Sequence, residues 1–168
     1  MKKLYFKQKV FKITDHYEVY NEHDEIEYYV DQDFRFMGFS VNVTDAGRNY
    51  VFNIEREVFS LLPKFYINFK DGSNLIMKSR LSFLKKVIDV ESEDLQLRLE
   101  GDIWDYNFRV YNQDNEIAFI TKKLFSWGDT YEMTILDSYY SDVILAITIG
   151  VDCIKDAQRA ASSTSSDS

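Results

Sequence analysis

Apolar and polar residues follow a two-strand pattern that recurs six times along this chain. Each repeat begins at an apolar anchor, and the intervals between anchors shorten from 24 to 21 residues. Seven places after every anchor stands another apolar residue, and two places further on the residue is apolar in every unit but one, which has Asn112. An offset of two is the period of a β-strand, so each repeat predicts two strands. The anchors are Val10, Phe34, Val58, Leu81, Ile103 and Leu124, and the residues seven places later are Tyr17, Val41, Phe65, Ile88, Val110 and Tyr131.

Alternation within the repeats shows which residues face the core. Leu95, Leu97 and Leu99, for example, flank the polar residues Gln96 and Arg98. One face of the strands is therefore predicted to be apolar and the other to be wet. The polar segments between repeats have the composition of hairpin turns. They cover residues 21–24, 44–47, 70–73 and 112–115, and Asp71-Gly72 is the strongest turn signal among them.

Six two-strand units joined by short turns predict a meander of about twelve strands. An open meander of this length leaves two unprotected edges, whereas a barrel covers them. We therefore expect a mainly β protein, a twelve-stranded closed β-barrel built of six hairpin-like units. Pro63 is the only proline and stands where its unit should turn, which is consistent with a strand edge or a bend.

The pattern changes near the C-terminus, where nine of the twelve residues from Val143 to Ile154 are apolar without period-two alternation. Twelve residues are too few to span a bilayer as a helix, which needs about 20. A helix that is apolar on all sides is normally wrapped by protein, so we expect a buried helix at about 142–157, with Asp142 as its candidate N-cap, enclosed by the barrel. A β-strand is the competing interpretation, because Val and Ile are frequent here.

The length of 168 residues fits a single domain, predicted to cover residues 1–157. The Ser-rich residues 158–168 are expected to form a disordered tail. The formal net charge of −8 disfavours nucleic-acid binding, since phosphates would be repelled. The single Cys153 permits no disulfide within the chain, and no signal peptide is recognisable at the N-terminus, so a cytoplasmic location is predicted.

Few residues have the spacing of a catalytic or metal site. His16 and His23 stand beside polar turn residues and are interpreted as surface histidines. Asp102 and Asp105 bracket Ile103-Trp104, but in a strand a spacing of three places two carboxylates on opposite faces unless the chain turns between them. The sequence therefore predicts no metal, no cofactor and no enzymatic activity.

The residue immediately before each anchor is charged in all six units. These residues are Lys9, Asp33, Glu57, Arg80, Asp102 and Lys123. The simplest interpretation is a ring of exposed charges at one end of the strands. A functional alternative is a basic patch for an anionic head group or a partner protein, and its candidate contact residues are Lys85, Lys86, Lys122 and Lys123.

Four segments of the chain resemble the LURP-one-related family, which includes small bacterial members. They are KKLFSWGDTYE at residues 122–132, EGDIWDY at 100–106, FSLLPK at 59–64 and KQKVF at 7–11. The resemblance covers about residues 1–157. It implies the fold of the tubby C-terminal domain and the phospholipid scramblases, a twelve-stranded barrel closed around a hydrophobic C-terminal helix. Tubby-type domains bind phosphoinositides through basic side chains, but no such motif matches here, so no site residue is carried over.

Two functional hypotheses follow from these observations. The first is a non-enzymatic cytoplasmic binding or scaffold module whose partner is an unknown protein or lipid, because a barrel filled by its own helix leaves only loops and rims for recognition. The second is a peripheral protein that binds anionic lipid, docking through the four lysines with aromatic residues such as Phe125 or Trp127 at the membrane interface. An enzyme ranks third.

Overall fold

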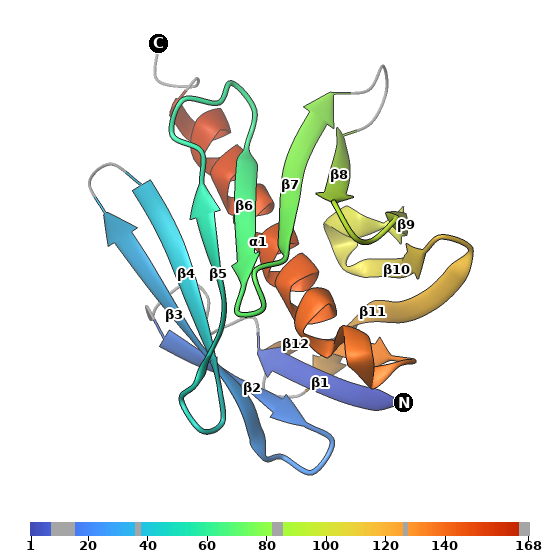
Figure 1. The fold of residues 1–168 in the computed structure, drawn as a ribbon. Coiled ribbons are helices and arrows are strands. Elements are labelled where there is room, and N and C mark those ends of the chain that lie inside the picture. The colour runs from blue at the N-terminus through green and yellow to red at the C-terminus, as the bar shows by residue number, and fades with distance from the viewer. Residues whose placement is uncertain (8–15, 36–37, 82–85, 126–127, 165–168) are drawn as a thin grey trace.

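A computed structural model shows a β-barrel threaded by one long helix (Figure 1). The structure describes residues 1–7, 16–35, 38–81, 86–125 and 128–164. The strands form the wall of the barrel, and the helix fills its interior.

Twelve strands form a single antiparallel sheet. They are β1 (Lys2–Lys7), β2 (His16–Asn21), β3 (Ile26–Arg35), β4 (Gly38–Asp45), β5 (Tyr50–Arg56), β6 (Lys64–Phe69), β7 (Asn74–Leu81), β8 (Lys86–Ser92), β9 (Leu97–Asp102), β10 (Asn107–Asn112), β11 (Asn115–Phe125) and β12 (Gly128–Ile135). Strands that follow one another in the sequence pair with each other, except β8 and β9, which form the two ends of the sheet. In addition, β1 pairs with β12.

The barrel is nearly closed, with one seam between β8 and β9. These strands are joined by a short connection and lie close together, but within the described residues each has a ladder partner on one side only, β7 for β8 and β10 for β9. The prediction of a mainly β, twelve-stranded barrel is confirmed, and the seam replaces the full closure that we expected.

Every residue seven places after an anchor faces the interior and is buried, as the repeat predicted; these six residues are Tyr17, Val41, Phe65, Ile88, Val110 and Tyr131. The anchors themselves behave differently. Val58 and Leu81 are exposed, and Ile103 lies in the short helix η2 (Ile103–Asp105). The reason is geometric, since the odd-numbered strands end at or near the anchors, where the chain leaves the barrel wall and the strand period no longer decides burial.

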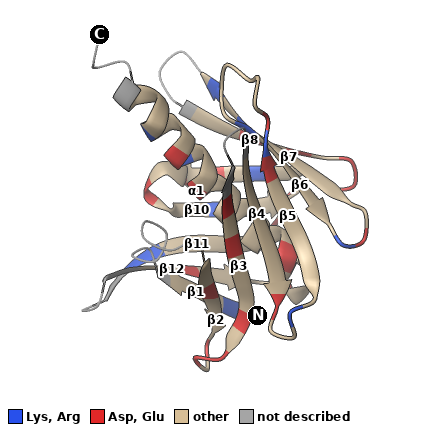
Figure 2. Ribbon diagram, turned by 90° about the vertical axis from the view of Figure 1, so that its left-hand side faces the viewer, with Lys and Arg blue, Asp and Glu red and all other residues tan. Residues whose placement is uncertain are grey.

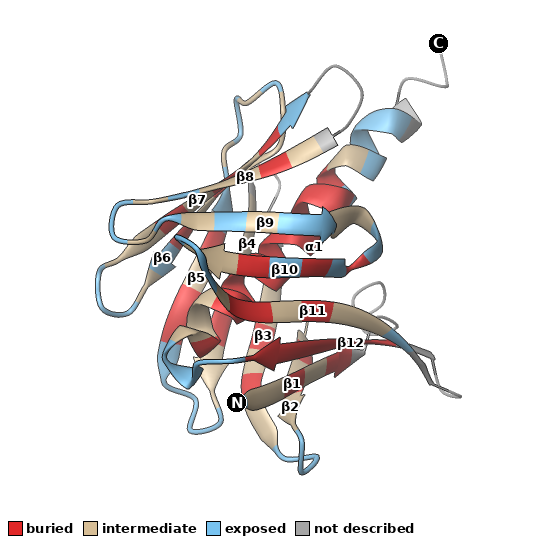
Figure 3. Cartoon of the chain, turned by 90° about the vertical axis from the view of Figure 1, so that its right-hand side faces the viewer, coloured by how far each residue is buried: buried red, intermediate tan, exposed pale blue. Residues whose placement is uncertain are grey.

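The hydrophobic C-terminal segment forms the helix α1 (Ser141–Thr164), which runs through the barrel (Figures 1 and 3). Residues 144–151 are all buried, and most have no exposed surface. Gly150 lies so close to the side chain of Met77 on β7 that an added Cβ would collide with it. The helix was therefore the correct interpretation, and the strand alternative was wrong.

The helix is longer than the sequence predicted. Residues 158–164 were expected to be disordered, but the structure places them in α1, and residues 165–168 lie outside the described part. Alanines favour the helical backbone here. Gln158 Nε2 also donates a hydrogen bond to Ser79 Oγ on β7 at 2.7 Å, and Arg159 pairs with Asp156 at 3.2 Å.

The candidate N-cap Asp142 lies in the first turn of α1, which begins one residue earlier than expected and follows the short helix η3 (Ser138–Tyr140). The Asp142 carboxylate accepts a hydrogen bond from the hydroxyl of Tyr28 on β3 at 2.7 Å. The bond ties the start of the helix to the barrel wall. Predicted turns lie between β2 and β3, β4 and β5, β6 and β7, and β10 and β11, and Pro63 lies in the bend before β6.

The two ends of the barrel differ in chemistry. At one end of the barrel, even-numbered strands connect to the next odd-numbered strands and α1 begins; we call this the turn end. We call the opposite end, where α1 finishes, the loop end. Most of the acidic excess lies at the turn end, and Figure 2 shows acidic residues in several of the turns. Its acidic residues are Glu22, Asp24, Glu25, Glu27, Asp45, Asp71, Glu93, Asp94, Asp114, Glu116, Asp137 and Asp142, against fewer basic residues such as Lys2, Arg48 and Lys70.

Candidate functional site

An open cavity of about 710 Å³ lies at the turn end, beside the start of α1. It is bordered by residues from β3 to β8, from the connections β6–β7 and β8–β9, and from η3 and α1. Four aromatic residues form part of its wall, namely Tyr28, Tyr50, Phe69 and Tyr139. Tyr139 is 81% exposed and stands at the rim, whereas Tyr28 is only 5% exposed and lies deeper.

Five carboxylates line the same cavity, Glu27, Asp45, Asp71, Asp94 and Asp142, together with one lysine, Lys70. Two of them stabilise turns. Asp45 accepts hydrogen bonds from the Asn49 backbone at 2.9 Å and from its side chain, and Asp71 accepts from the Ser73 hydroxyl at 2.6 Å and backbone at 2.9 Å. These bonds lower the pKa of both carboxyl groups, so both remain ionised at neutral pH.

Only part of this negative charge is neutralised by neighbouring cations. Lys2 pairs with Glu27 at 3.2 Å, and its ammonium group lies 5.7 Å from the centre of the Tyr28 ring. Burial raises the pKa of Tyr28, and the carboxylate of Asp142 raises it further, so Tyr28 is a neutral hydrogen-bond donor. The cavity therefore combines an apolar aromatic wall with a negatively charged rim.

A second group of polar side chains lies deep in the barrel, near the loop end of α1. The Tyr106 hydroxyl donates a hydrogen bond to the carboxylate of Asp152 on α1. Lys155, one turn further along α1, donates to the Trp104 carbonyl oxygen at 2.6 Å, and its ammonium group lies 3.8 Å from the centre of the Tyr106 ring. Tyr106 is also stacked on Tyr131 with ring centres 4.0 Å apart. We call Tyr106, Asp152 and Lys155 the core polar cluster.

The core polar cluster ties η2 to the central helix. Tyr106 has a left-handed backbone with φ of 51°, at the point where the chain leaves η2 for β10. Burial raises the pKa of Asp152 to about 6 and lowers the pKa of Lys155. Tyr106 is 1% and Asp152 6% exposed, so a substrate would have no direct access to either. A structural role for the cluster agrees with this geometry.

The other candidate residues from the sequence are Asp102, Asp105 and the two histidines. The chain turns between Asp102 and Asp105, because Asp102 caps η2 by accepting a hydrogen bond from the Asp105 backbone at 3.1 Å. His16 contacts Asp31 on β3 at 2.5 Å, and His23 is exposed in the turn after β2. Among the residues that the structure describes, no three His, Cys, Asp or Glu side chains gather as a metal-binding group.

The four predicted lysines are not shown to form a patch. Lys85 lies outside the described residues, and Lys86 begins β8 with a side chain that is not described. Lys122 is half-buried and Lys123 is exposed, both on β11. The strands β8 and β11, which carry Lys86 and the pair Lys122 and Lys123, are not neighbours in the sheet.

The charged positions before the anchors are mostly at the surface, as the ring interpretation requires. Asp33, Arg80, Asp102 and Lys123 are exposed and Glu57 is half-buried, whereas Lys9 lies outside the described residues. Of the aromatic residues proposed for a membrane interface, Phe125 has a side chain that is not described, and Trp127 lies outside the described part.

Sequence reasoning missed the cavity, because its walls come from segments that are distant along the chain and show no shared local pattern. It also missed the exposed apolar side chains of the connection between β5 and β6, where Phe59 is 93% exposed. The sequence did contain a signal for these exposed side chains. The apolar pairs Val58-Phe59 and Leu61-Leu62, beside the single proline, do not follow the alternation of a strand. No helix within the described part is both long and apolar enough to cross a membrane.

Comparison with known proteins places the chain among relatives without an assigned activity. A protein of Bacillus subtilis (strain 168) named "Uncharacterized protein YxjI" is 27% identical over 151 residues, which cover 90% of this chain and 91% of that protein. No solved structure gives a significant match. The family described as LURP-one-related matches residues 2–152, and with this match the chain belongs to the LURP-one-related family.

Proposed function

We propose that this protein is a non-enzymatic binding module that recognises its ligand at the turn end of the barrel. The observation that carries the proposal is the filled interior. α1 occupies the space in which other barrels hold a ligand, and its residues 144–151 are buried against the wall. Recognition is therefore left to the ends and the outer surface.

The open cavity makes the turn end the better of these places. Its volume of about 710 Å³ is within the range of ligand sites, roughly 300 to 1,000 Å³. Aromatic side chains provide apolar contact there, and hydrogen-bonding groups such as Asp94 and Ser73 provide specificity. The expected ligand is a small molecule or a short segment of a protein partner, and the expected location of the protein is the cytoplasm.

Site-specific photo-crosslinking tests this proposal. Benzoylphenylalanine in place of Tyr139, at the cavity rim, should give a discrete crosslinked species when the protein is irradiated in cells. The same probe in place of Tyr66, on the outer wall of β6, is the control for non-specific contact. Equal products from both positions, or none from Tyr139, would contradict the proposal.

A charge variant then tests whether the cavity itself is the site. Asp94→Arg places a long cationic side chain at the cavity lining and should remove the Tyr139 crosslink. Asp114→Arg is the matched control, because Asp114 is exposed at the turn end but does not line the cavity. Loss of the crosslink in both variants would point to general electrostatics rather than to the cavity.

Peripheral binding of anionic lipid is a second candidate function. A separate observation favours it, the presence of fully exposed apolar side chains at the loop end, opposite the acidic turn end. The residues that the sequence offers for contact with lipid head groups are Lys85, Lys86, Lys122 and Lys123. If these lysines converge, binding should weaken as salt rises and should fall when all four are changed to Ala.

A further inference from the structure

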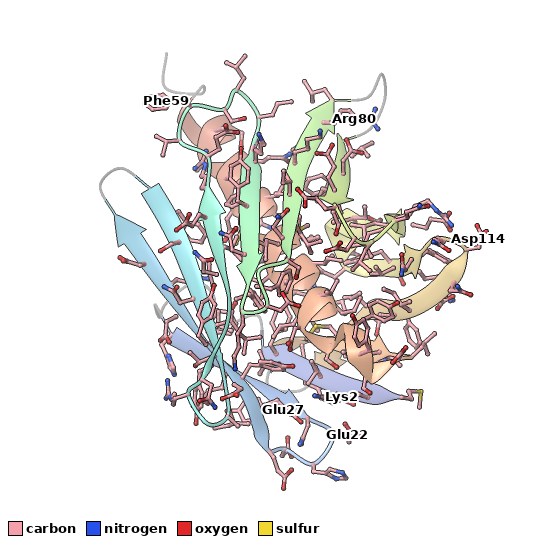
Figure 4. The ribbon with its side chains drawn as sticks, viewed as in Figure 1. Lys2, Glu22, Glu27, Phe59, Arg80 and Asp114 are labelled. Atoms are coloured by element: carbon pink, nitrogen blue, oxygen red, sulfur yellow. The ribbon has the colours of Figure 1, made fainter. Side chains whose placement is uncertain are left out.

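Exposed apolar side chains at the loop end are concentrated in two neighbouring segments of the barrel. In the connection from β5 to β6, Phe59 is 93% and Leu61 103% exposed, and Val58 is half exposed. Leu81, at the end of β7, is 69% exposed. Figure 4 shows Phe59 and Arg80 at this end and Lys2, Glu22 and Glu27 at the other. We call Val58, Phe59, Leu61 and Leu81 the apolar tip.

The connection that carries the apolar tip is held by hydrogen bonds. The Glu57 backbone donates to the Lys64 carbonyl oxygen at 2.9 Å and closes the loop, and the Ser60 hydroxyl donates to the Leu62 carbonyl oxygen at 2.5 Å. The Ser79 backbone on β7 donates to the Pro63 carbonyl oxygen at 2.9 Å. Phe59 and Leu61 are thus presented to solvent by an ordered loop, where they add nothing to the core.

We propose that the apolar tip docks the protein on an anionic lipid bilayer, with Phe59 and Leu61 entering the interfacial region. This inference rests on the second candidate function and gives it a surface and an orientation. It is independent of the cavity at the turn end. A bilayer fits the geometry better than a protein does, since single protruding side chains enter a deformable interface, whereas a stable protein interface needs roughly 800 Å² of complementary surface on each partner.

The charge distribution supports the same orientation. At the loop end, Arg56 and Lys123 are exposed and have no ion-pair partner among the described residues, while Lys64, Lys78 and Arg80 are paired with Glu57, Glu91 and Asp89. Glu22 and Glu27, two of the acidic residues of the turn end, lie at the opposite end of the barrel (Figure 4). Asp33 and Asp102 are also exposed at the loop end, so its charges are mixed. An anionic surface therefore repels the acidic turn end more strongly than the loop end, which orients the apolar tip toward lipid.

Vesicle co-sedimentation of the full chain tests this inference. The probes are phosphatidylcholine vesicles with and without phosphatidylserine, at low and physiological salt. The double variant Phe59→Ser/Leu61→Ser should bind the anionic vesicles about tenfold less tightly than the wild type, because two apolar side chains no longer enter the interface. Tyr139→Ser, which removes an exposed aromatic side chain at the turn end, should bind as the wild type does.

A spectroscopic readout separates insertion from simple attraction. Tryptophan in place of Phe59 should shift its emission to the blue when anionic vesicles are added, and tryptophan in place of Tyr139 should not. Both serine variants alter exposed side chains, so their melting temperatures should match that of the wild type and exclude misfolding as a cause.

Three results would overturn the inference. Absence of wild-type binding at low salt would remove it together with the second candidate function. Binding that is lost in the quadruple lysine variant but unchanged in Phe59→Ser/Leu61→Ser would keep lipid binding and refute the apolar tip. Equal binding to vesicles without phosphatidylserine would refute the anionic partner. None of these results bears on crosslinking at Tyr139, so the cavity proposal is judged separately.

Discussion

Replacing Asp152 by Asn should stabilise the protein at neutral pH. Asp152 lies on α1 inside the barrel, is 6% exposed, and accepts a hydrogen bond from the Tyr106 hydroxyl. Burial raises its pKa from 3.8 to about 6, and Asp156 adds to the rise, while Tyr106, Lys155 and Arg159 oppose it. Asparagine retains an oxygen that accepts the bond from Tyr106 but carries no charge that must be desolvated.

The magnitude follows from linkage between protonation and folding. When a carboxyl group has a higher pKa in the folded state than in the unfolded state, its contribution to stability is fully present at low pH, where both states are protonated. For Asp152 this contribution is lost as pH rises from 3.8 to about 6, because the carboxylate then ionises inside the barrel. At about 1.4 kcal/mol per pKa unit, the ionised Asp152 costs about 3 kcal/mol above that window. Of this, about 2 kcal/mol should appear between about pH 4.5 and pH 7.5.

Denaturant unfolding of wild type and Asp152→Asn across this pH range measures the effect. The difference in unfolding free energy should grow in favour of the variant by about 2 kcal/mol as pH rises. Asp114→Asn is the control, because Asp114 is exposed in the turn between β10 and β11, does not act on Asp152, and should give a nearly constant difference. A difference for Asp152→Asn that stays constant, or that shrinks with rising pH, would refute the reasoning and show that Lys155 compensates the buried charge.

Three further substitutions probe packing and backbone geometry. Gly150→Ala should lower stability by about 1 to 3 kcal/mol, because its Cβ collides with Met77, and equal melting temperatures would show that Met77 moves aside freely. Gly101→Ala should cost a similar amount, about 1 to 3 kcal/mol, because φ is 116° and its Cβ would lie 2.6 Å from the Asn107 carbonyl oxygen; an unchanged unfolding curve would argue against this strain. Ile147→Asp should cost several kcal/mol and cause misfolding or aggregation, since it buries an unpaired charge, whereas Ile147→Val should cost only about 1 kcal/mol; a soluble aspartate variant with wild-type melting temperature would contradict the buried helix.

The wall of the barrel could be predicted from sequence because strand periodicity is local. The residue seven places after each anchor is buried in every unit, since period two fixes the inner face along the whole strand. The anchors Val58 and Leu81 are apolar and yet exposed, because they stand where strands end. There the chain turns, and burial is decided by neighbouring loops that the local pattern does not contain.

Long-range contacts set the limit of what the helix sequence could reveal. Its apolar run showed that the helix is buried, but Asp152 and Lys155 within it needed polar partners that sequence spacing could not identify. Tyr106 and the Trp104 carbonyl group supply them from η2 and the residue after it, 46 and 51 residues away along the chain. The cavity is hidden for the same reason, because its carboxylates look like ordinary turn residues until the fold brings the turns together.

Hydrogen exchange of α1 in the folded protein tests the central claim most directly, that the barrel interior is permanently occupied by its own helix. The amides of residues 144–154 should exchange only through global unfolding, with a free energy equal to that from denaturant unfolding and to that of the central strands β4 and β5. If α1 exchanged at a much lower free energy while these strands stayed protected, the helix would leave the barrel in the native state. The interior would then be open to ligands, and the assignment of recognition to the barrel ends would be wrong.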